Sequence, residues 1–431
     1  MKRTISFWLI IVPNLAIFYL SLWLVILLWY PQGLSKEQQY DHVVSFSVIY
    51  AIWLITFFSF RLFERETFRR YSILFYNLLT ATIVNVFIAI GYFYFQPELL
   101  LTPRRFLLVH IVITFSFIFI WDLLIKWFVF SRYIQPVYFF SFNPELKYLE
   151  EEIKKHSYMG FKVEGQIKQE ELDSLHPGDV VVFPDNLHAD ASMANTIFNF
   201  RNREIIFYNH NYFYETLLRR VYINSLSQIW FLQNLTYRKR VFFNLIKEIF
   251  DILIGVISIC VFAITFPFVA ILVKLTSSGP IFFKQERVGK DGKIFNIYKY
   301  RTMAVGTEND TWTEIGDQRI TRSGKFLRLT RIDELPQSIN LLIGNMSVVG
   351  PRPEQVGIVE GLKKAIPFYE ERQIVKPGIT GWAQLNIYAR NLDETKIKLE
   401  YDLYYIKNQS VFMDFEIIVK TAYNILTFQG Q

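Results

Sequence analysis

Long runs of apolar residues, separated by short polar links, fill the first third of the chain. They cover residues 4–35, 43–60, 71–97 and 106–130, and the first three contain no charged residue. A helix of about 20 apolar residues crosses the hydrocarbon core of a bilayer. The pattern therefore predicts a four-helix transmembrane bundle over residues 1–134. The first run is too long for a removable signal peptide, and no small-residue cleavage site follows it.

Charged residues in the links between these runs predict an orientation. The link at residues 61–70 holds four arginines, whereas the first link holds a single basic residue, Lys36. Arg104 and Arg105 in the third link weaken this contrast without reversing it. Positively charged links stay in the cytoplasm, so the N-terminus and everything after residue 132 are expected there.

Composition agrees with a membrane protein. Hydrophobic residues make up 52% of the chain and charged residues 20%, below the roughly 25% of average soluble proteins. The net charge of +7 does not by itself indicate nucleic acid, because basic residues beside apolar segments set topology and meet lipid headgroups. A single cysteine, Cys260, excludes an internal disulfide framework and a cysteine-based metal cluster.

Between residues 135 and 235 short apolar strands alternate with charged helical segments. This alternation predicts a small, mostly parallel, Rossmann-like α/β domain. Such domains often bind nucleotides at a glycine-rich first turn, but the expected turn at residues 141–145 has no glycine and contains Pro144. A structural, regulatory or dimerising role and a ligand site both stay open for this domain.

A fifth apolar segment, at about residues 248–275, has Pro267 near its middle. Proline removes a helical hydrogen bond and kinks a helix. The segment is either a kinked spanning helix or a re-entrant helix that dips into one leaflet and returns. The re-entrant interpretation is favoured because the charged domains on both sides are expected in the cytoplasm. Its break needs polar groups such as Thr265 to satisfy the backbone.

The most chemically distinctive residues of the last section are the adjacent carboxylates Asp333 and Glu334. Pro336 places them near a helix N-terminus, where the helix dipole favours ionised carboxylates. Neighbouring helical side chains do not share a face, so the two are expected to act differently. Oxygen ligands of this kind suit Mg²⁺ together with substrate phosphates, and a carboxylate is also a possible covalent nucleophile. Alone, such a pair would more commonly cap a helix.

Many cations surround the pair in sequence. Arg328 and Arg331 precede it, and Arg352 is fixed between two prolines. A strand-like alternation would place Lys299 and Arg301 on one face. Further polar groups are expected in a turn containing Gln285 and Arg287, and in a glycine-bearing loop with Lys376 and Trp382. Guanidinium groups bind phosphate in bidentate fashion, so this set suits a diphosphate substrate and a metal ion.

Five sequence blocks resemble one known family. Residues 239–431 are similar to the bacterial sugar transferases, the monotopic polyprenyl-phosphate hexose-1-phosphate transferases. The blocks are Gly-Pro-Ile-Phe-Phe-Lys-Gln-Glu-Arg-Val-Gly (279–289), Tyr-Lys-Tyr-Arg-Thr-Met (298–303), Arg-Ile-Asp-Glu-Leu-Pro-Gln (331–337), Gly-Asn-Met-Ser-Val-Val-Gly-Pro-Arg-Pro (344–353) and Lys-Pro-Gly-Ile-Thr-Gly-Trp-Ala-Gln (376–384). The four helices and α/β domain in front resemble long-form members that initiate exopolysaccharide, capsule or O-antigen (lipopolysaccharide) synthesis.

The resemblance implies an α-rich monotopic catalytic domain over residues 236–431, with a re-entrant helix, in the bacterial inner membrane. It implies transfer of a sugar-1-phosphate from a UDP-sugar to undecaprenyl phosphate, with release of UMP. Asp333 would be the nucleophile that forms an aspartyl-phosphosugar intermediate, and Glu334 would help to hold Mg²⁺. The phosphate contacts are expected from Arg352, Arg328 and Lys299, and further from Arg301, Arg287 and Gln285.

Two rival functions remain. An inactive membrane-anchored scaffold of a polysaccharide assembly complex would be expected to carry lesions in the motif blocks, and none is seen. A transporter would need a run of polar residues through its helices. The sugar, the pathway and the oligomeric state, with a homodimer among the options, are not determined by the sequence.

Overall fold

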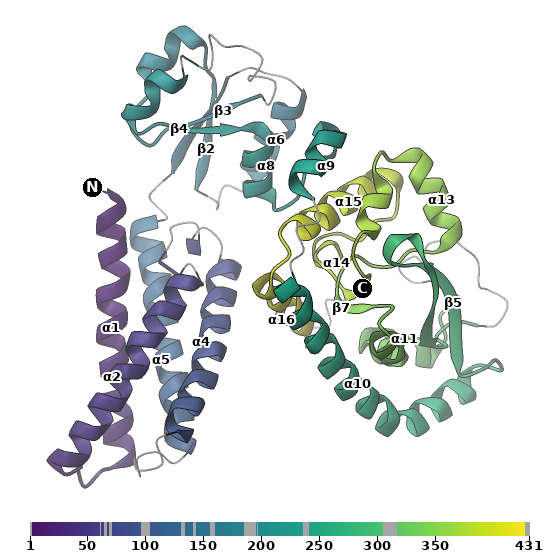
Figure 1. Ribbon diagram of the computed structural model, residues 1–431, viewed down its shortest axis with the longest axis horizontal. Coiled ribbons are helices and arrows are strands. Elements are labelled where there is room, and N and C mark those ends of the chain that lie inside the picture. Colours follow the sequence, from purple (N-terminus) through teal and green to yellow (C-terminus); the bar gives the residue numbers. More distant parts are fainter. Residues whose placement is uncertain are drawn as a thin grey trace. The chain divides into compact units, whose positions relative to one another are not determined.

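The computed structural model divides into two compact units, Met1–Phe213 and Tyr214–Gln431 (Figure 1). The predicted catalytic domain, 236–431, lies wholly within the second unit. The structure describes residues 2–60, 62–63, 67–68, 71–95, 104–130, 134–140, 144–155, 160–184, 195, 197–235, 241–304 and 317–426.

The apolar runs of the first unit are long helices. They are α1 (Lys2–Trp29), α2 (Lys36–Ser59), α4 (Tyr71–Tyr94) and α5 (Arg104–Ile125), the last continued by a π-helical turn, Lys126–Phe130. Helix α1 packs against α5, and α4 packs against both α2 and α5. Together with a helix of the second unit, five described helices are long and apolar enough to cross a membrane. The chain is therefore a membrane protein.

Polar side chains buried among these helices bond to one another. The Tyr50 hydroxyl donates to the Phe18 carbonyl at 3.0 Å and lies 3.0 Å from His110 Nε2. The hydroxyls of Ser21 and Thr114 are 2.7 Å apart. Polar groups in hydrocarbon must find partners within the protein, and such bonds join neighbouring helices. The described helices thus contain buried polar residues that serve their packing.

The α/β part of the first unit confirms the predicted parallel sheet. Its strands are ordered β2-β1-β3-β4 and all neighbours are parallel. Val180, Val181 and Val182 of β3 are all buried, as expected for a strand covered on both faces. The turn predicted at residues 141–145 lies partly outside the described residues, because residues 141–143 are not among them. The elements are β1 (Gln135–Phe139), α6 (Pro144–Lys155), β2 (Phe161–Gln166), a 3₁₀ segment (Gln169–Ser174), β3 (Val180–Phe183), a 3₁₀ turn (Phe200–Arg203) and β4 (Ile206–Asn209). They are followed by α8 (His210–Leu218), which begins in the first unit and ends in the second.

The second unit contains one long helix, α10 (Val241–Thr276), with Pro267 inside it. The helix curves along its length (Figure 1). Two residues before Pro267, the Thr265 hydroxyl donates to the Val261 carbonyl at 2.8 Å. The buried residues of α10 are Asp251, Gly255, Val269 and Val273, and most of its other apolar side chains face outward. An exposed apolar surface of this size marks a site of interaction with a membrane or with another protein.

The remaining elements form a compact body on α10. Its core includes Leu341, Met346, Trp382, Leu399 and Leu403. The elements are α9 (Gln228–Asn234), β5 (Phe282–Val288), β6 (Ile294–Tyr300), α11 (Arg322–Leu329), the 3₁₀ helix η8 (Ile332–Gln337), α12 (Ser338–Ile343), β7 (Ser347–Val349), α13 (Val356–Ala365), the 3₁₀ helix η9 (Tyr369–Gln373), β8 (Gly378–Thr380), α14 (Trp382–Asn386), α15 (Leu392–Lys407) and α16 (Val411–Leu426).

The segment that follows residue 213 is fixed to this body by Glu400 of α15. Its carboxylate accepts hydrogen bonds from the Tyr214 hydroxyl at 2.8 Å and the Ile223 amide at 3.2 Å. The Glu400 carbonyl accepts from the Val221 amide at 3.1 Å. These bonds explain why residues 214–226 belong to the second unit.

Two charged residues of α10 attach it to β7. The Lys247 ammonium donates to the Val349 carbonyl at 2.9 Å and to Asp414 at 2.6 Å. Asp251 accepts from the Ser347 hydroxyl at 2.9 Å and the Val348 amide at 2.8 Å. Since β7 leads directly into the Gly-Pro-Arg-Pro block, the apolar helix is joined to a segment with predicted site residues.

Candidate active site

A single cleft of about 1690 Å³ in the second unit collects the residues proposed from the sequence. They come from β5, β6 and the residue after it, α11, η8 and the segment after β7, and several of these elements are distant in sequence. The predicted residues that line it are Gln285, Arg287, Lys299, Arg301, Arg328, Asp333, Glu334 and Arg352.

The two carboxylates lie in the first turn of η8, as the sequence predicted for a helix N-terminus. The residue before this helix, Arg331, has a φ of 57°. Left-handed backbone at a non-glycine residue costs roughly 1–3 kcal/mol and is concentrated at functional sites. Asp333 and Glu334 are only 6% and 8% exposed, so their charges need partners or protons.

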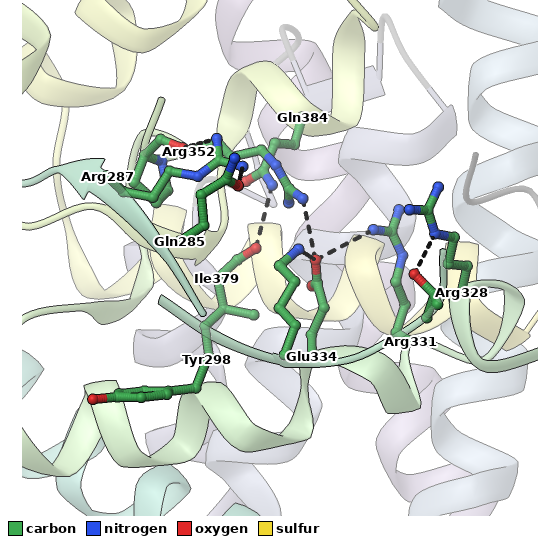
Figure 2. A network of polar contacts seen from close by, with 12 residues as sticks. Gln285, Arg287, Tyr298, Arg328, Arg331, Glu334, Arg352, Ile379 and Gln384 are labelled. Atoms are coloured by element: carbon green, nitrogen blue, oxygen red, sulfur yellow. Dashed lines mark hydrogen bonds and ion pairs between the residues drawn. The ribbon is translucent and has the colours of Figure 1, made fainter. Parts of the chain in front are cut away.

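Glu334 is surrounded by cations. Its Oε1 lies 2.9 Å from Lys299 Nζ, 3.1 Å from Arg352 Nη2 and 3.9 Å from Arg331 Nη1. Figure 2 shows the two arginines reaching this carboxylate from different sides. Burial raises the pKa of Glu334, but the charges of Lys299, Arg352 and Arg331 outweigh it and hold the pKa well below its usual range. Glu334 is therefore ionised.

Asp333 has the opposite environment. Within the described part of the chain, its Oδ1 is buried and has no hydrogen-bond partner. Burial and the neighbouring Glu334 charge raise the pKa of Asp333 to about 6, against the opposing effect of Lys299, Arg328 and Arg331. Two adjacent carboxylates with pKa values pushed apart are typical of groups with different chemical roles. The expected division of roles thus has an electrostatic basis.

Arg328 is oriented toward the cleft by one neighbour. Its Nε donates to the Thr302 hydroxyl at 2.9 Å (Figure 2). Among the described residues, this bond leaves the terminal nitrogens of the guanidinium without a hydrogen-bond partner. Those nitrogens are the ones that form bidentate contacts with phosphate.

The three other residues predicted to contact phosphate make hydrogen bonds to groups of the protein itself. Arg301 Nε donates to the Pro280 carbonyl at 3.0 Å. Arg287 donates to the Pro353 carbonyl at 3.2 Å and to Gln285 Oε1 at 2.6 Å. The prediction that Gln285 and Arg287 stand in a turn is wrong: both lie in β5, which pairs with β6. The turn comes later, at Lys290–Gly292.

The expected contribution of the loop at 376–382 to the cleft is confirmed only in part, because Ile379 and Thr380 line the cleft but the predicted cation, Lys376, and ring, Trp382, do not. Trp382 is buried and donates from Nε1 to the Arg219 carbonyl at 3.0 Å, and Lys376 faces Glu248 at 3.4 Å. The glycines serve close backbone packing, since a Cβ on Gly378 would lie 2.1 Å from Gly350 N. A Cβ on Gly381 would lie 2.2 Å from the Gly350 carbonyl oxygen. This loop therefore supports the Gly-Pro-Arg-Pro block.

Sequence reasoning missed several polar residues that line the cleft. Arg319, which pairs with Asp317 at 2.6 Å, and Lys398 are not within the motif blocks. For the missed residues between the blocks at 298–303 and 331–337, the available signal was the density of cations in that part of the sequence. The missed lining residues include Asp317, Arg319, Arg322, Lys325, Glu354, Gln384 and Lys398.

The site fits a divalent cation that is held jointly with a substrate. No cluster of three or more His, Cys, Asp or Glu side chains stands ready for a metal within the described ranges. The unpartnered Asp333 Oδ1 and the adjacent Glu334 supply carboxylate oxygens. Mg²⁺ is commonly bound by one or two carboxylates together with phosphate oxygens and water. These two carboxylates would therefore hold Mg²⁺ with a diphosphate.

Comparison with known proteins agrees with this site. Residues 242–428 match the family described as bacterial sugar transferase. An Aeromonas hydrophila protein named UDP-N-acetylgalactosamine-undecaprenyl-phosphate N-acetylgalactosaminephosphotransferase is 49% identical over 188 residues, 43% of this chain and 44% of that protein. UDP-glucose:undecaprenyl-phosphate glucose-1-phosphate transferase of Escherichia coli K12 is 42% identical over 186 residues, 42% of this chain and 40% of that protein.

The match thus spans less than half the length of these two relatives. A shorter relative is covered almost completely: the exopolysaccharide production protein PSS of Rhizobium leguminosarum is 40% identical over 191 residues, which are 42% of this chain and 96% of that protein. The matched part coincides with the unit that carries the carboxylate pair, its cations and the apolar helix α10. The chain belongs to the bacterial sugar transferase family.

Proposed function

We propose that this protein transfers a sugar-1-phosphate from a UDP-sugar to undecaprenyl phosphate, or a similar polyprenyl phosphate, and releases UMP. The observation that carries the proposal is Asp333: a buried carboxyl with an unpartnered oxygen, in a cleft lined by cations. Relatives whose names specify undecaprenyl-phosphate sugar-phosphate transferases support it. The product would start the assembly of an exopolysaccharide, a capsule or an O-antigen.

In the first step an Asp333 oxygen attacks the β-phosphorus of the UDP-sugar. A bond forms between that oxygen and phosphorus, and the bond from the β-phosphorus to the bridging oxygen breaks. UMP leaves with the bridging oxygen. Lys299, Arg328 and Arg352 line the same cleft and would offset the negative charge that builds up as the phosphorus is attacked. The result is an aspartyl-phosphosugar intermediate.

In the second step a phosphate oxygen of the polyprenyl phosphate attacks the same phosphorus. The new bond completes a diphosphate, and the bond to Asp333 breaks, which regenerates the carboxylate. A mechanism with a covalent intermediate divides one difficult transfer into two and gives ping-pong kinetics. Because both steps take place at the same phosphorus atom, the two substrates would occupy the cleft one after the other.

Mg²⁺, when bound, would neutralise phosphate charge and polarise the phosphorus–oxygen bonds. Glu334 would hold it through an oxygen while its Oε1 stays paired with Lys299 and Arg352. This arrangement keeps Glu334 ionised and stationary. Asp333, which lacks such partners, keeps an oxygen for attack.

The proposed setting is the bacterial inner membrane. The four N-terminal helices would form a transmembrane bundle with the N-terminus in the cytoplasm. Helix α10 would be re-entrant, because its outward-facing apolar side chains and its curved course, with Pro267 inside the helix, suit a helix that enters and leaves the same leaflet. The cleft would then meet the headgroup of a lipid substrate on the cytoplasmic side.

Purified full-length protein with UDP-sugars, undecaprenyl phosphate and Mg²⁺ is expected to release UMP, measured by coupled luminescence. Chelation of Mg²⁺ with EDTA should lower the rate at least about 100-fold, because metal ions stabilise several kcal/mol of charge in such transition states. Excess Mg²⁺ should restore it. No UMP from any common UDP-sugar would favour the inactive scaffold.

The orientation of α10 has a separate test. Single cysteines at Gln233 and Lys363, exposed residues on either side of the helix, would be placed in a Cys260→Ser background. A re-entrant helix leaves both on the cytoplasmic face, so an impermeant maleimide should label both only after the cells are opened. Labelling of Lys363→Cys in intact spheroplasts, with Gln233→Cys protected, would show that α10 crosses.

A further inference from the structure

The backbone around Arg352 is held at four consecutive carbonyls. The Pro351 carbonyl accepts from the Gly378 amide at 2.9 Å, and the Glu354 carbonyl accepts from the Val288 amide at 3.0 Å. The two carbonyls between them accept from arginine side chains. These are Arg372 Nη2, 3.0 Å from the Arg352 oxygen, and Arg287 Nη1, 3.2 Å from the Pro353 oxygen.

Side chains are needed at these two points because of the local sequence. The prolines at 351 and 353 lack N–H groups, so the segment cannot pair as an ordinary strand. An arginine offers five donors in a fixed planar fork, and it can fill several such contacts at once. The Arg352 side chain itself is thereby free to reach Glu334, where its Nη2 donates to Oε1 at 3.1 Å.

Arg372 is itself aimed by a buried carboxylate. It comes from η9 and is 5% exposed, and Asp402 of α15 is 1% exposed. Its Nε and Nη2 lie 2.9 Å and 2.7 Å from Asp402 Oδ2, and its Nη1 donates to the Tyr369 hydroxyl at 3.0 Å. Contacts on three sides of the guanidinium leave little freedom for the nitrogen that holds the Arg352 carbonyl.

The residue after Pro353 is fixed from the same direction. Glu354 pairs with Lys398 of α15 and lies 3.8 Å from Arg372 Nη1. Burying a charged pair costs desolvation energy, and a hydrophobic replacement is often as stable. The cost of burying Arg372 and Asp402 therefore suggests a purpose beyond stability.

We propose that Arg372 is a positioning residue for phosphoglycosyl transfer: held by Asp402, it fixes the backbone of Arg352 so that the Arg352 guanidinium meets Glu334 and the diphosphate of the substrate. The inference rests on the proposed function. Arg372 acts through Arg352, whose backbone carbonyl it holds, and is not itself a catalytic residue. A misplacement of about 1 Å at a reacting group can cost about 100-fold in rate.

Arg372→Lys in the full-length protein is the first test, because it keeps a charge beside Asp402 but cannot make all the bonds of the fork. We expect kcat/KM for the UDP-sugar to fall about 10- to 100-fold, with a raised KM and weaker binding of UDP in a calorimetric titration. In an Arg352→Ala background the same change should cost less than about threefold, because the group that Arg372 positions is already absent. Independent, multiplicative losses would overturn the proposal.

Arg219→Lys is the matched control. Arg219 makes a two-bond pair with Glu416, at 2.7 Å and 2.9 Å, which is half-buried rather than fully buried, and it does not line the cleft. A similar loss of thermal stability without the change in KM or UDP binding is expected. Equal effects on UDP binding from Arg219→Lys and Arg372→Lys would show that Arg372 has only a structural role.

The double variant Arg372→Met with Asp402→Leu separates positioning from folding. It removes both charges, so neither is left buried alone, and we expect a folded protein with the same loss of UDP binding as Arg372→Lys. Wild-type affinity in this variant would overturn the proposal. Should wild-type protein bind UDP yet release no UMP from any UDP-sugar, the proposed function fails while the binding comparison still tests Arg372.

Discussion

Asp333→Asn is expected to abolish turnover, with a loss of about 10³-fold or more in kcat, because nucleophile removal commonly has effects of that size or larger. It should also abolish a covalent intermediate. With a UDP-sugar labelled in its β-phosphate, denatured wild-type protein should retain label when no polyprenyl phosphate is added, and the variant should retain none. The physical reason is that an amide oxygen is a far poorer nucleophile than the carboxylate it replaces.

The matched control is Asp393→Asn. Asp393 is an exposed carboxylate in the first turn of α15 and pairs with Lys396 at the surface. Near-wild-type turnover and labelling are expected of it. Normal turnover in Asp333→Asn would rule out Asp333 as the nucleophile. Loss of turnover with retained label would mean that another residue carries the phosphosugar.

The second large effect is that substitutions of the two adjacent carboxylates should change the stability of the protein in opposite directions. Glu334→Gln removes the negative charge that Lys299, Arg331 and Arg352 share. Breaking a buried ion pair from one side typically costs about 3–5 kcal/mol, so this variant should unfold at a markedly lower temperature in metal-free buffer. Its turnover should also collapse, because the Mg²⁺ ligand is lost.

Asp333→Asn should instead stabilise the metal-free protein. The pKa of Asp333 is raised to about 6 by burial and by Glu334, so the folded state holds this proton to a higher pH than the unfolded chain. The resulting contribution favours folding below about pH 4 and is lost as the pH rises through 6. At pH 8 the neutral amide should therefore gain roughly 1–3 kcal/mol.

Thermal unfolding followed by intrinsic fluorescence in EDTA checks both variants. The gain from Asp333→Asn should vanish near pH 4, where wild-type Asp333 is protonated in the folded protein. Glu360→Gln, at an exposed position on α13, is the control, and surface changes of this kind alter stability by less than about 0.5 kcal/mol. Destabilisation of similar size by both carboxylate substitutions would contradict the opposite environments described for the pair.

The local pattern was sufficient for the long apolar helices and for the buried strand of the parallel sheet. The apolar runs became α1, α2, α4, α5 and α10, because uninterrupted apolar sequence of that length has few other stable forms in a membrane. The valines at 180–182 lie in a parallel sheet, since a strand covered on both faces is apolar without alternation. Local signals failed at β5, whose mixture of polar residues resembled a turn.

The sequence by itself determined eight of the residues that gather in the cleft, because ordered motif blocks hold seven of them and Arg328 lies just before the third block. Only the tertiary structure decided how they differ. Three cations converge on Glu334 and none of the described groups bonds to Asp333 Oδ1. It also assigned Arg287 and the glycines of the last block to holding backbone, and revealed Arg372. A pKa or a positioning role depends on distances and burial set by chain segments far apart in sequence, and no linear motif records them.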